Sequence, residues 1–156
     1  MSYKINFKSG ITILESLIVF LLIGIIVAIF VYLLGNQRAV TRDLKRLSDV
    51  SVIQSSLSQY WLQQAHYPVS KGVYLADPKT GLVKLTANGF VGQSDKSNVV
   101  FLSKLPIGPK HGEYYFYKGN EQGYSLHIKT ETATAYGPPG DYYIHKQSVD
   151  RDDTIK

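Results

Sequence analysis

The sequence contains no cysteine among its 156 residues. This absence excludes a disulfide framework, a thiolate metal site, a thiol nucleophile and lipid attachment through sulfur. Charge is also scarce, because only 19% of the residues are charged while 44% are hydrophobic. That composition is wrong for a disordered chain, and the length suits one ordinary domain with an additional segment. The formal net charge of +5 is spread along the chain, which is weaker than the basic stripe of a dedicated nucleic-acid binder.

Charge is missing altogether from residues 17–34, which read LIVFLLIGIIVAIFVYLL. Eighteen helical residues span about 27 Å, and a count from Ile11 gives about 36 Å, which brackets a hydrocarbon core of about 30 Å. A buried core helix is the alternative interpretation, but a chain of this size is too small to cover such a helix on all sides. We therefore expect a transmembrane helix.

A secretory signal peptide is the other alternative, because Lys4 and Lys8 precede the apolar run. Such a peptide has an apolar core of about 7 to 15 residues that ends at small residues. The run here is longer and is followed by residues 35–38, which read GNQR. We expect no cleavage after the apolar run.

A glutamate lies in the first turn of the apolar segment, where residues 9–15 read SGITILE. A carboxylate costs about 2.5 to 3.5 kcal/mol at the centre of a membrane helix and less near its end, so it usually has a partner and a function. The succession of a short basic leader, Gly10, Thr12 within apolar residues, Glu15 and a long aliphatic helix resembles the class III signal of type IV pilins and pseudopilins. Gly24 also lies where that family commonly has glycine.

The resemblance implies how this chain is processed. A membrane-embedded prepilin peptidase would cut between Gly10 and Ile11 and methylate the new N-terminus at Ile11, and Glu15 would act in assembly. A count of Lys and Arg alone would place residues 38–46 in the cytoplasm, so the extracytoplasmic position of the head rests on the resemblance. Tyr32 stands where many pilins have a helix-kinking proline, which favours a minor pilin or a pseudopilin.

Beyond Gly35 the apolar residues recur at spacings of three and four, which predicts a single apolar helical stripe. The stripe consists of Val40, Leu44, Leu47, Val50, Ile53, Leu57 and Tyr60. We interpret the polar residues of the opposite side as a solvated face. They are Arg42, Asp43, Lys45, Arg46, Asp49, Ser51, Ser55 and Gln59. No proline precedes Pro68, so the helix is predicted to run from about Thr12 to about Gln64.

From His66 onward the chain contains most of its glycines and all six prolines, which predicts strands and loops. The clearest hairpin joins residues 113–117 to residues 124–130, because apolar and polar residues alternate along the second run. Other expected strands are residues 99–105 and 142–145, and a smaller hairpin joining 73–75 to 82–85 around 77–81.

These patterns predict an α+β, pilin-like fold. A long N-terminal helix, transmembrane in its lower half, would pack by its upper half on a small antiparallel β-sheet. The expected divisions are a cytoplasmic prepilin leader at 1–10, a transmembrane and assembly helix at 11–34, an amphipathic upper helix at 35–65, an antiparallel β head at 66–146 and a flexible tail at 147–156.

Motifs for catalysis and cofactor binding are missing from the sequence. The histidines do not have the spacing of a metal motif, and neither G-x-S-x-G nor a glycine-rich phosphate loop occurs. We therefore expect no enzyme and no cofactor. Some pseudopilins of type II secretion bind calcium in a late loop, so the resemblance makes Asn120, Glu121 and Asp141 the calcium candidates, although no EF-hand pattern is present.

Seven of the twelve tyrosines lie between residues 113 and 145. Neighbouring residues on a strand face opposite sides, so one member of each pair, Tyr114 with Tyr115 and Tyr142 with Tyr143, must face outward or lie at an edge. An outward tyrosine could stack on sugar, DNA bases or another subunit. Ordinary β-propensity explains the same residues.

The leading hypothesis is a structural subunit, a prepilin or pseudopilin that assembles through its N-terminal helix into a type IV pilus or a pseudopilus of type II secretion kind. Its partners would be the prepilin peptidase, other pilin or pseudopilin subunits and the inner-membrane assembly platform. The alternative is a bitopic membrane protein with an extracytoplasmic ligand-binding or enzymatic head. DNA binding of the competence type would be a specialised form of the first hypothesis.

Overall fold

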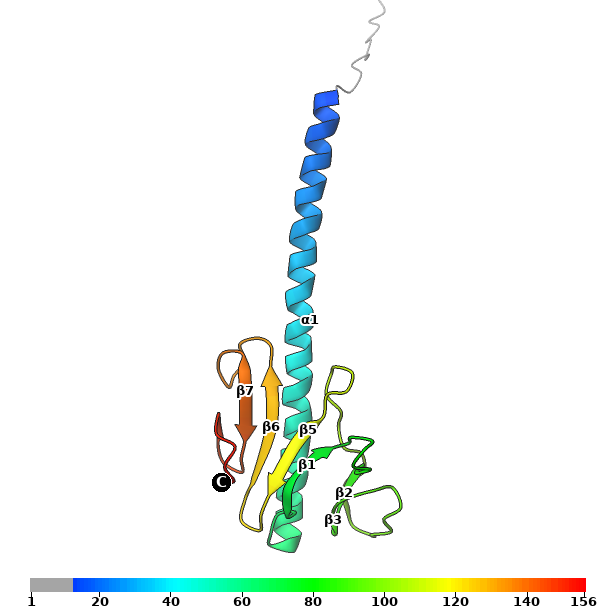
Figure 1. Cartoon of the computed structure of the whole chain (residues 1–156), viewed down its shortest axis with the longest axis vertical. Helices are drawn as coiled ribbons and strands as arrows, with labels where there is room; N and C mark the ends of the chain where they lie inside the picture. The colour runs from blue at the N-terminus through cyan, green and yellow to red at the C-terminus, as the bar shows by residue number, and fades with distance from the viewer. Residues whose placement is uncertain (1–12) are drawn as a thin grey trace, which may run out of the picture. The chain divides into compact units, whose positions relative to one another are not determined.

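The computed structural model describes residues 13–156, which form one long helix and eight strands. They divide into two compact units, the first ending at Arg38 and the second comprising Ala39–Lys156. Helix α1 (Ile13–Gln64) runs through the first unit and into the second, as the blue to green ribbon of Figure 1 shows. Strands and loops make up the rest of the second unit.

Helix α1 ends where the sequence predicts. Its last residue is Gln64, and Ala65 follows with a positive φ of 58°. The N–H of Ala65 donates to the carbonyl of Trp61 at 2.8 Å, which satisfies one of the carbonyl groups that a helix end leaves open. Pro68 follows three residues later and prevents the helix from resuming.

The larger sheet is antiparallel throughout and has the strand order β1-β5-β6-β7-β8. Figure 1 shows β1, β5, β6 and β7 side by side in this order. The strands comprise Ser70–Leu75 (β1), Tyr115–Gly119 (β5), Tyr124–Thr130 (β6), Gly140–Ile144 (β7) and Val149–Asp150 (β8).

The hairpin of β5 and β6 confirms the clearest strand prediction. Gly119 pairs with Tyr124, and the alternation of β6 buries Tyr124, Leu126 and Ile128 as expected. Asn120 closes the turn, because its side-chain oxygen accepts hydrogen bonds from the N–H groups of residues 122 and 123, each at 2.9 Å. An asparagine that bonds to the backbone two residues on is typical of such turns.

The predicted smaller hairpin is wrong. Its first half is β1, which pairs with β5, and its second half belongs to a separate three-stranded sheet of order β3-β2-β4. These strands are Lys84–Thr86 (β2), Gly89–Val91 (β3) and Val100–Leu102 (β4). The turn at 77–81 does form, but pairing β1 with β5 places Leu75 opposite Tyr115 inside the core, which buries more apolar surface than a two-stranded hairpin would.

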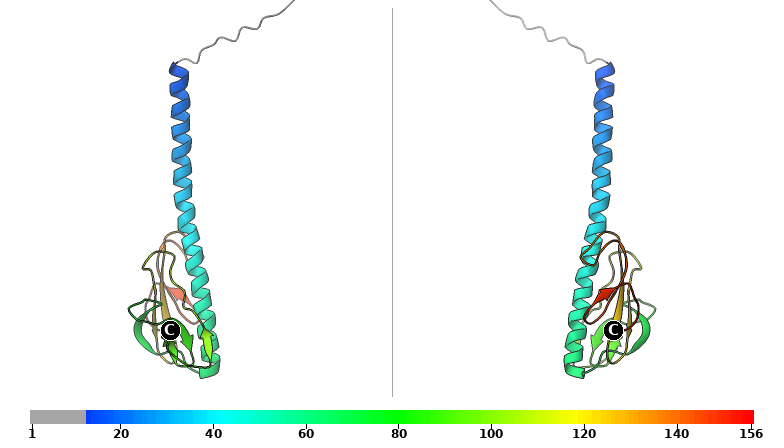
Figure 2. Two further views of the ribbon diagram at one scale, coloured as in Figure 1. Left: turned by 90° about the vertical axis from the view of Figure 1, so that its right-hand side faces the viewer. Right: turned by 90° about the vertical axis from the view of Figure 1, so that its left-hand side faces the viewer.

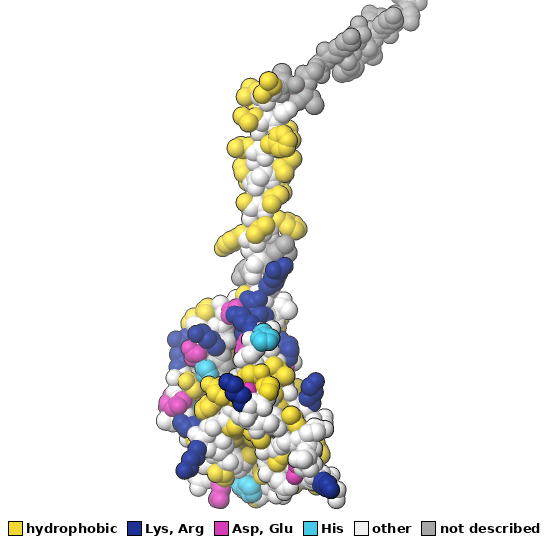
Figure 3. Space-filling view, turned by 45° about the vertical axis from the view of Figure 1, so that its right-hand side comes forward, with side chains coloured by type: hydrophobic (Ala, Val, Ile, Leu, Met, Phe, Trp, Pro, Cys, Tyr) yellow, Lys and Arg dark blue, Asp and Glu magenta, His cyan; other side chains and the backbone are white. Residues whose placement is uncertain are grey.

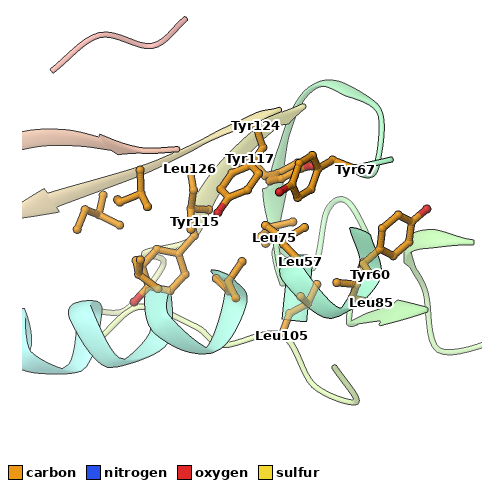
Figure 4. Close-up of a cluster of buried hydrophobic side chains, with 14 of the residues drawn as sticks. Leu57, Tyr60, Tyr67, Leu75, Leu85, Leu105, Tyr115, Tyr117, Tyr124 and Leu126 are labelled. Carbon is orange, nitrogen blue, oxygen red and sulfur yellow. The ribbon is translucent and has the colours of Figure 1, made fainter. Parts of the chain in front are cut away.

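The core lies between the second half of α1 and the sheets (Figure 4). Val50, Ile53, Leu57 and Tyr60 of the helix are at most 3% exposed. In Figure 2 the sheet lies along one side of the helix of the second unit, which is the expected α+β arrangement. The sheet side of the core is rich in tyrosine, and the hydroxyl of buried Tyr117 donates to the carbonyl of Pro68 at 2.8 Å.

The end of the chain, expected as a flexible tail at 147–156, contains a short strand, and its flexibility stays a prediction. Residues 149–150 form β8 on the edge of the larger sheet. Asp150 contacts the Nε2 atom of buried His145 at 3.1 Å and the ammonium of Lys156 at 2.6 Å. These partners are close in the sequence, since β8 pairs with the preceding strand β7 and Asp150 contacts residues five positions before it and six positions after it.

Candidate functional site

The first unit presents apolar side chains on every side of its helix. Its large apolar residues between Ile13 and Leu33 are between 49% and 90% exposed. Figure 3 shows these apolar side chains in yellow on the face of the helix that is turned to the viewer. The 18-residue window of highest hydropathy has a mean hydropathy of 3.3, so α1 is long and apolar enough to cross a membrane.

The predicted cleavage and methylation positions, Gly10 and Ile11, lie outside the described residues. Glu15 lies in the first turn of α1 and is exposed. A carboxylate in the first turn of a helix interacts favourably with the positive end of the helix dipole. The structure therefore places Glu15 at the start of the apolar helix, and its predicted role in assembly stays a prediction.

The calcium candidates are not brought together. Asn120 and Glu121 lie in the turn between β5 and β6, while Asp141 pairs with Lys129 near the other end of β6. Five residues of strand separate these positions along β6, or about 17 Å. Within residues 13–156, no group of three or more His, Asp or Glu side chains is arranged to hold a metal ion.

A cluster of charged side chains is buried in the second unit, on the face of α1 that the sequence assigns to solvent. Asp43 and Arg46 are each 2% exposed and Asp49 is 8% exposed. The interpretation of these three residues as solvated is therefore wrong, although Lys45, Ser51, Ser55 and Gln59 are exposed as expected. We call the eight charged residues that meet here the ionic cluster. They are Arg42, Asp43, Lys45, Arg46, Asp49, Lys110, Glu113 and Glu131.

Arg46 is the centre of the ionic cluster. Its Nε and Nη2 atoms donate to the two carboxylate oxygens of Glu113 at 2.6 and 2.8 Å. Its Nη1 atom donates to Asp43 at 2.7 Å and to Glu131 at 2.8 Å. This bidentate geometry is the arrangement in which a guanidinium binds a carboxylate most strongly.

Asp43 fastens the helix to the loop that follows β6. Its carboxylate accepts hydrogen bonds from the N–H groups of Glu131 and Thr132 and from the Thr132 hydroxyl, at 2.7 to 3.0 Å. Glu131 in turn accepts a bidentate pair from Arg42 at 2.9 and 2.6 Å and contacts Lys110 at 2.9 Å. The helix and this loop are thus joined by hydrogen bonds for which each of them supplies both donors and acceptors.

Asp49 extends the cluster toward the apolar core. The hydroxyl of buried Tyr115 donates to Asp49 at 2.7 Å, and Lys45 contacts the same carboxylate at 2.7 Å. The cluster as a whole contains four basic and four acidic residues, so its formal charge is zero. Among the described residues, no buried side-chain nitrogen or oxygen lacks a hydrogen-bond partner. These two properties explain how the buried members of the cluster, Asp43, Arg46 and Asp49, are tolerated away from water.

The surroundings of Asp43, Glu131 and Tyr115 shift the pKa values of these three groups away from neutral pH. Burial alone would raise the pKa of Asp43, but the hydrogen bonds from Thr132, Glu131 and Arg46 outweigh it and hold that pKa below its ordinary value. The hydrogen bond from Arg42 is the main cause that lowers the pKa of Glu131. Burial and the bond to Asp49 raise the pKa of Tyr115. None of these groups exchanges a proton near neutral pH, so the cluster is suited to holding elements together rather than to acid–base chemistry.

The buried positions of α1 do leave a signal in the sequence. Residues 43, 46, 50, 53, 57 and 60 recur at spacings of three and four, so they share one face. The predicted stripe followed residue type instead and chose Leu44, which is 61% exposed. The four buried apolar residues of α1 are Val50, Ile53, Leu57 and Tyr60. Their spacing, extended toward the N-terminus, would have placed Asp43 and Arg46 on the buried face of the helix.

The sequence is similar to that of a curated protein of known role. The chain is 27% identical over 118 residues to type II secretion system core protein G of Escherichia coli (strain K12). The alignment covers 74% of this chain and 76% of that protein. The chain is a distant homologue of a pseudopilin. The homology and the helix-and-sheet fold together confirm the resemblance to pilins and pseudopilins.

No protein-family model matches the chain, and no solved structure matches it. The pseudopilin relation therefore rests on the alignment with core protein G and on the pilin-like fold. The family is one of structural, non-enzymatic proteins.

Proposed function

We propose that this protein is a structural subunit of a pilin-like filament, of the type II secretion pseudopilus or type IV pilus kind. The observation that carries the proposal is the apolar helix of the first unit, whose side chains are exposed on every side. Such a surface requires apolar surroundings, which a bilayer supplies to a single subunit and which neighbouring helices supply within a filament. The homology to a protein of the type II secretion system supports the same conclusion.

In this proposal the chain is made as a precursor. A prepilin peptidase cleaves it between Gly10 and Ile11 and methylates Ile11. The helix then holds the subunit in the cytoplasmic membrane with the second unit on the extracytoplasmic side, until an inner-membrane assembly platform passes it to other subunits. In the second unit, hydrogen bonds lower the pKa values of Asp43 and Glu131 and join the helix to the loop after β6, which agrees with a structural role.

Glu15 is the residue that we propose to set the register of assembly. Cleavage creates a cationic amine at Ile11, either on the same chain or on a neighbouring subunit. Two opposite charges about 4 Å apart attract by about 4 kcal/mol at an effective dielectric of 20, before desolvation is subtracted. An incoming subunit would therefore be drawn to the position where the amine meets Glu15.

The test is to replace the charge of Glu15 in the full-length chain, expressed in its native host. We expect Glu15→Ala and Glu15→Gln to be inserted and processed, because Gly10 and the apolar helix are unchanged. Both variants should be present in the membrane fraction and missing from sheared filaments. The matched control is Ser16→Ala, a neighbouring change that leaves the charge and should enter filaments normally. Normal incorporation of Glu15→Gln would remove the assembly role assigned to this residue.

A further inference from the structure

His145 follows β7 directly and is buried, and both nitrogen atoms of its ring contact oxygen atoms. The residue is 1% exposed. Its Nδ1 atom lies 3.1 Å from the main-chain carbonyl oxygen of Tyr124, and its Nε2 atom lies 3.1 Å from a carboxylate oxygen of Asp150. A carbonyl oxygen only accepts hydrogen bonds, so the contact with Tyr124 requires a proton on Nδ1.

The contact with Asp150 requires a proton on Nε2 as well. The ammonium of Lys156 donates to the other carboxylate oxygen of Asp150 at 2.6 Å, and the N–H of Asp152 donates to the oxygen that contacts the ring, at 2.9 Å. The bond from Lys156 is the main cause that lowers the pKa of Asp150 below its ordinary value. Asp150 is therefore an ionised carboxylate, which has no proton to donate.

The two contacts of this ring cannot both be hydrogen bonds of a neutral imidazole, because a neutral imidazole carries a single N–H. In either neutral tautomer, a nitrogen lone pair would face the carbonyl of Tyr124 or the carboxylate of Asp150. The ring is buried, so water cannot replace the lost partner, and an unpaired buried group is costly. An imidazolium donates from both nitrogens and satisfies both oxygens.

The other groups around His145 leave Asp150 as its counter-ion. Burial raises the pKa of the Tyr124 hydroxyl to about 12, so this neighbour is neutral. Gln54 of α1 donates to the main-chain carbonyl of His145 at 3.3 Å and bears no charge. The ammonium of Lys146 donates to a carbonyl in the turn between β5 and β6 at 3.1 Å. Among the described residues, Asp150 is thus the charged side chain that contacts the ring.

The ring and Asp150 hold the last residues of the chain, 146–156, which we call the C-terminal segment. Within it, β8 pairs with β7 and covers the edge of that strand. The segment returns to the turn between β5 and β6, where a Cβ atom on Gly123 would collide with the main-chain carbonyl of Lys156. Asp150 contacts both the buried ring and Lys156, so it connects the interior to the far end of the segment.

We propose that His145 is an imidazolium in the folded protein and that this buried cation is a pH-sensitive lock for the C-terminal segment. When the pH rises and the ring loses a proton, one of its two hydrogen bonds is replaced by a lone pair that faces an oxygen. The C-terminal segment then loosens, and β8 separates from β7. The edge of β7 becomes open to pairing with another strand.

The direction of the pH dependence follows from the proton that the folded state requires. A histidine in an unfolded chain loses its second proton near pH 6.5. The lock is therefore complete below about pH 6.5 and is lost as the pH rises through the value at which the folded ring gives up its proton. This proposal does not depend on filament assembly.

The test is NMR of the full-length protein in detergent micelles, with nitrogen-15 in its histidines. At about pH 7.5 a histidine of an unfolded chain is about nine-tenths neutral. We expect His145 to show a proton on both ring nitrogens at this pH and to lose one of them as the pH is raised further. Amide exchange of residues 146–156, corrected for its intrinsic pH dependence, should rise about tenfold or more over the same range. His145→Gln identifies the ring signals.

Asp150→Asn locates the lock. The amide of asparagine can donate to Nε2, so a neutral ring keeps both contacts in this variant. We expect a single ring N–H on His145 at about pH 7.5, and amide exchange of the C-terminal segment that no longer rises with the proton loss. The matched control is Asp141→Asn, which removes the carboxylate 3.0 Å from Nε2 of His127, a partly exposed ring. It should leave the signals of His145 unchanged.

Three results would overturn the proposal. The first is a single ring N–H on His145 at about pH 7.5 in the folded, unsubstituted protein. The second is amide exchange of the C-terminal segment that does not change when the ring loses its proton. The third is a ring that keeps both protons at this pH in Asp150→Asn. None of these measurements involves Glu15, so their failure would leave the filament proposal to its own test.

Discussion

Arg46 has the most demanding environment among the described charged residues, because it is 2% exposed and contacts three carboxylates. A buried ion pair is not by itself stabilising, since the cost of removing two charges from water offsets much of their attraction. Removing one member is a different matter, because the remaining charges stay buried without compensation. The contribution of the ionic cluster to the stability of the fold is therefore best measured by replacing Arg46.

We expect Arg46→Met to lower the free energy of unfolding by about 3 to 5 kcal/mol, because Asp43, Glu113 and Glu131 lose their shared cation. The control is Lys45→Met on the same helix, which removes a half-exposed partner of Asp49 and should cost about 1 kcal/mol or less. Urea unfolding followed by circular dichroism measures both. Equal costs for the two variants would mean that the cluster does not hold the helix to the sheet.

The lowered pKa values of Asp43 and Glu131 predict that the protein loses stability in acid. A carboxyl group whose pKa is lower in the folded state contributes stability above its unfolded pKa of about 4, and loses it as the pH falls through the folded value. The urea midpoint should be level between about pH 5 and 7 and should fall steadily below about pH 4. Glu131→Gln should reduce the fall of the urea midpoint in acid. Part of the fall should remain in this variant, because the pKa of Asp150 is also lowered in the folded protein. A midpoint that rises on acidification would contradict the assigned pKa shifts.

At the scale of elements, local patterns were enough where neighbours in the sequence decide the structure. The lack of proline and the three-and-four spacing predicted the end of α1 at Gln64, and strict alternation predicted β6 at residues 124–130. The small hairpin was predicted wrongly, because β1 pairs with the distant strand β5. That pairing depends on which strand offers a matching apolar face, and alternation alone does not determine that choice.

The two halves of α1 should be separable by truncation. All buried apolar residues of the described chain lie between Val50 and Ile144, so the second unit contains its own core. We expect residues 36–156 to be soluble without detergent and to unfold cooperatively, with the circular dichroism of mixed helix and strand. Thermal and urea unfolding would measure this. A fragment that expresses well but lacks cooperative unfolding would show that the apolar half of α1 is needed for the fold.

For the whole molecule, the sequence predicted the fold class correctly, but it did not predict which charged residues are buried. The apolar run, the helical stripe and the β6 alternation are each local, and together they left one α+β arrangement. The ionic cluster joins residues 67 to 89 positions apart, such as Arg46 with Glu113 and Arg42 with Glu131. No local pattern specifies such pairs, and charged residues on a helix are usually solvated, so Asp43, Arg46 and Asp49 were assigned to the solvent although they are buried.

We propose that the chain becomes a filament subunit only after cleavage at Gly10, and intact-mass analysis of membrane-extracted protein is the most direct test. We expect a product that begins at Ile11, lacks residues 1–10 with their two lysines, and carries one additional methyl group. A mature protein that retains Met1 to Gly10 would rule out this processing and favour a bitopic membrane protein with a ligand-binding or enzymatic head. Cleavage after Leu34 would contradict it equally, since the apolar helix would then be a secretory signal.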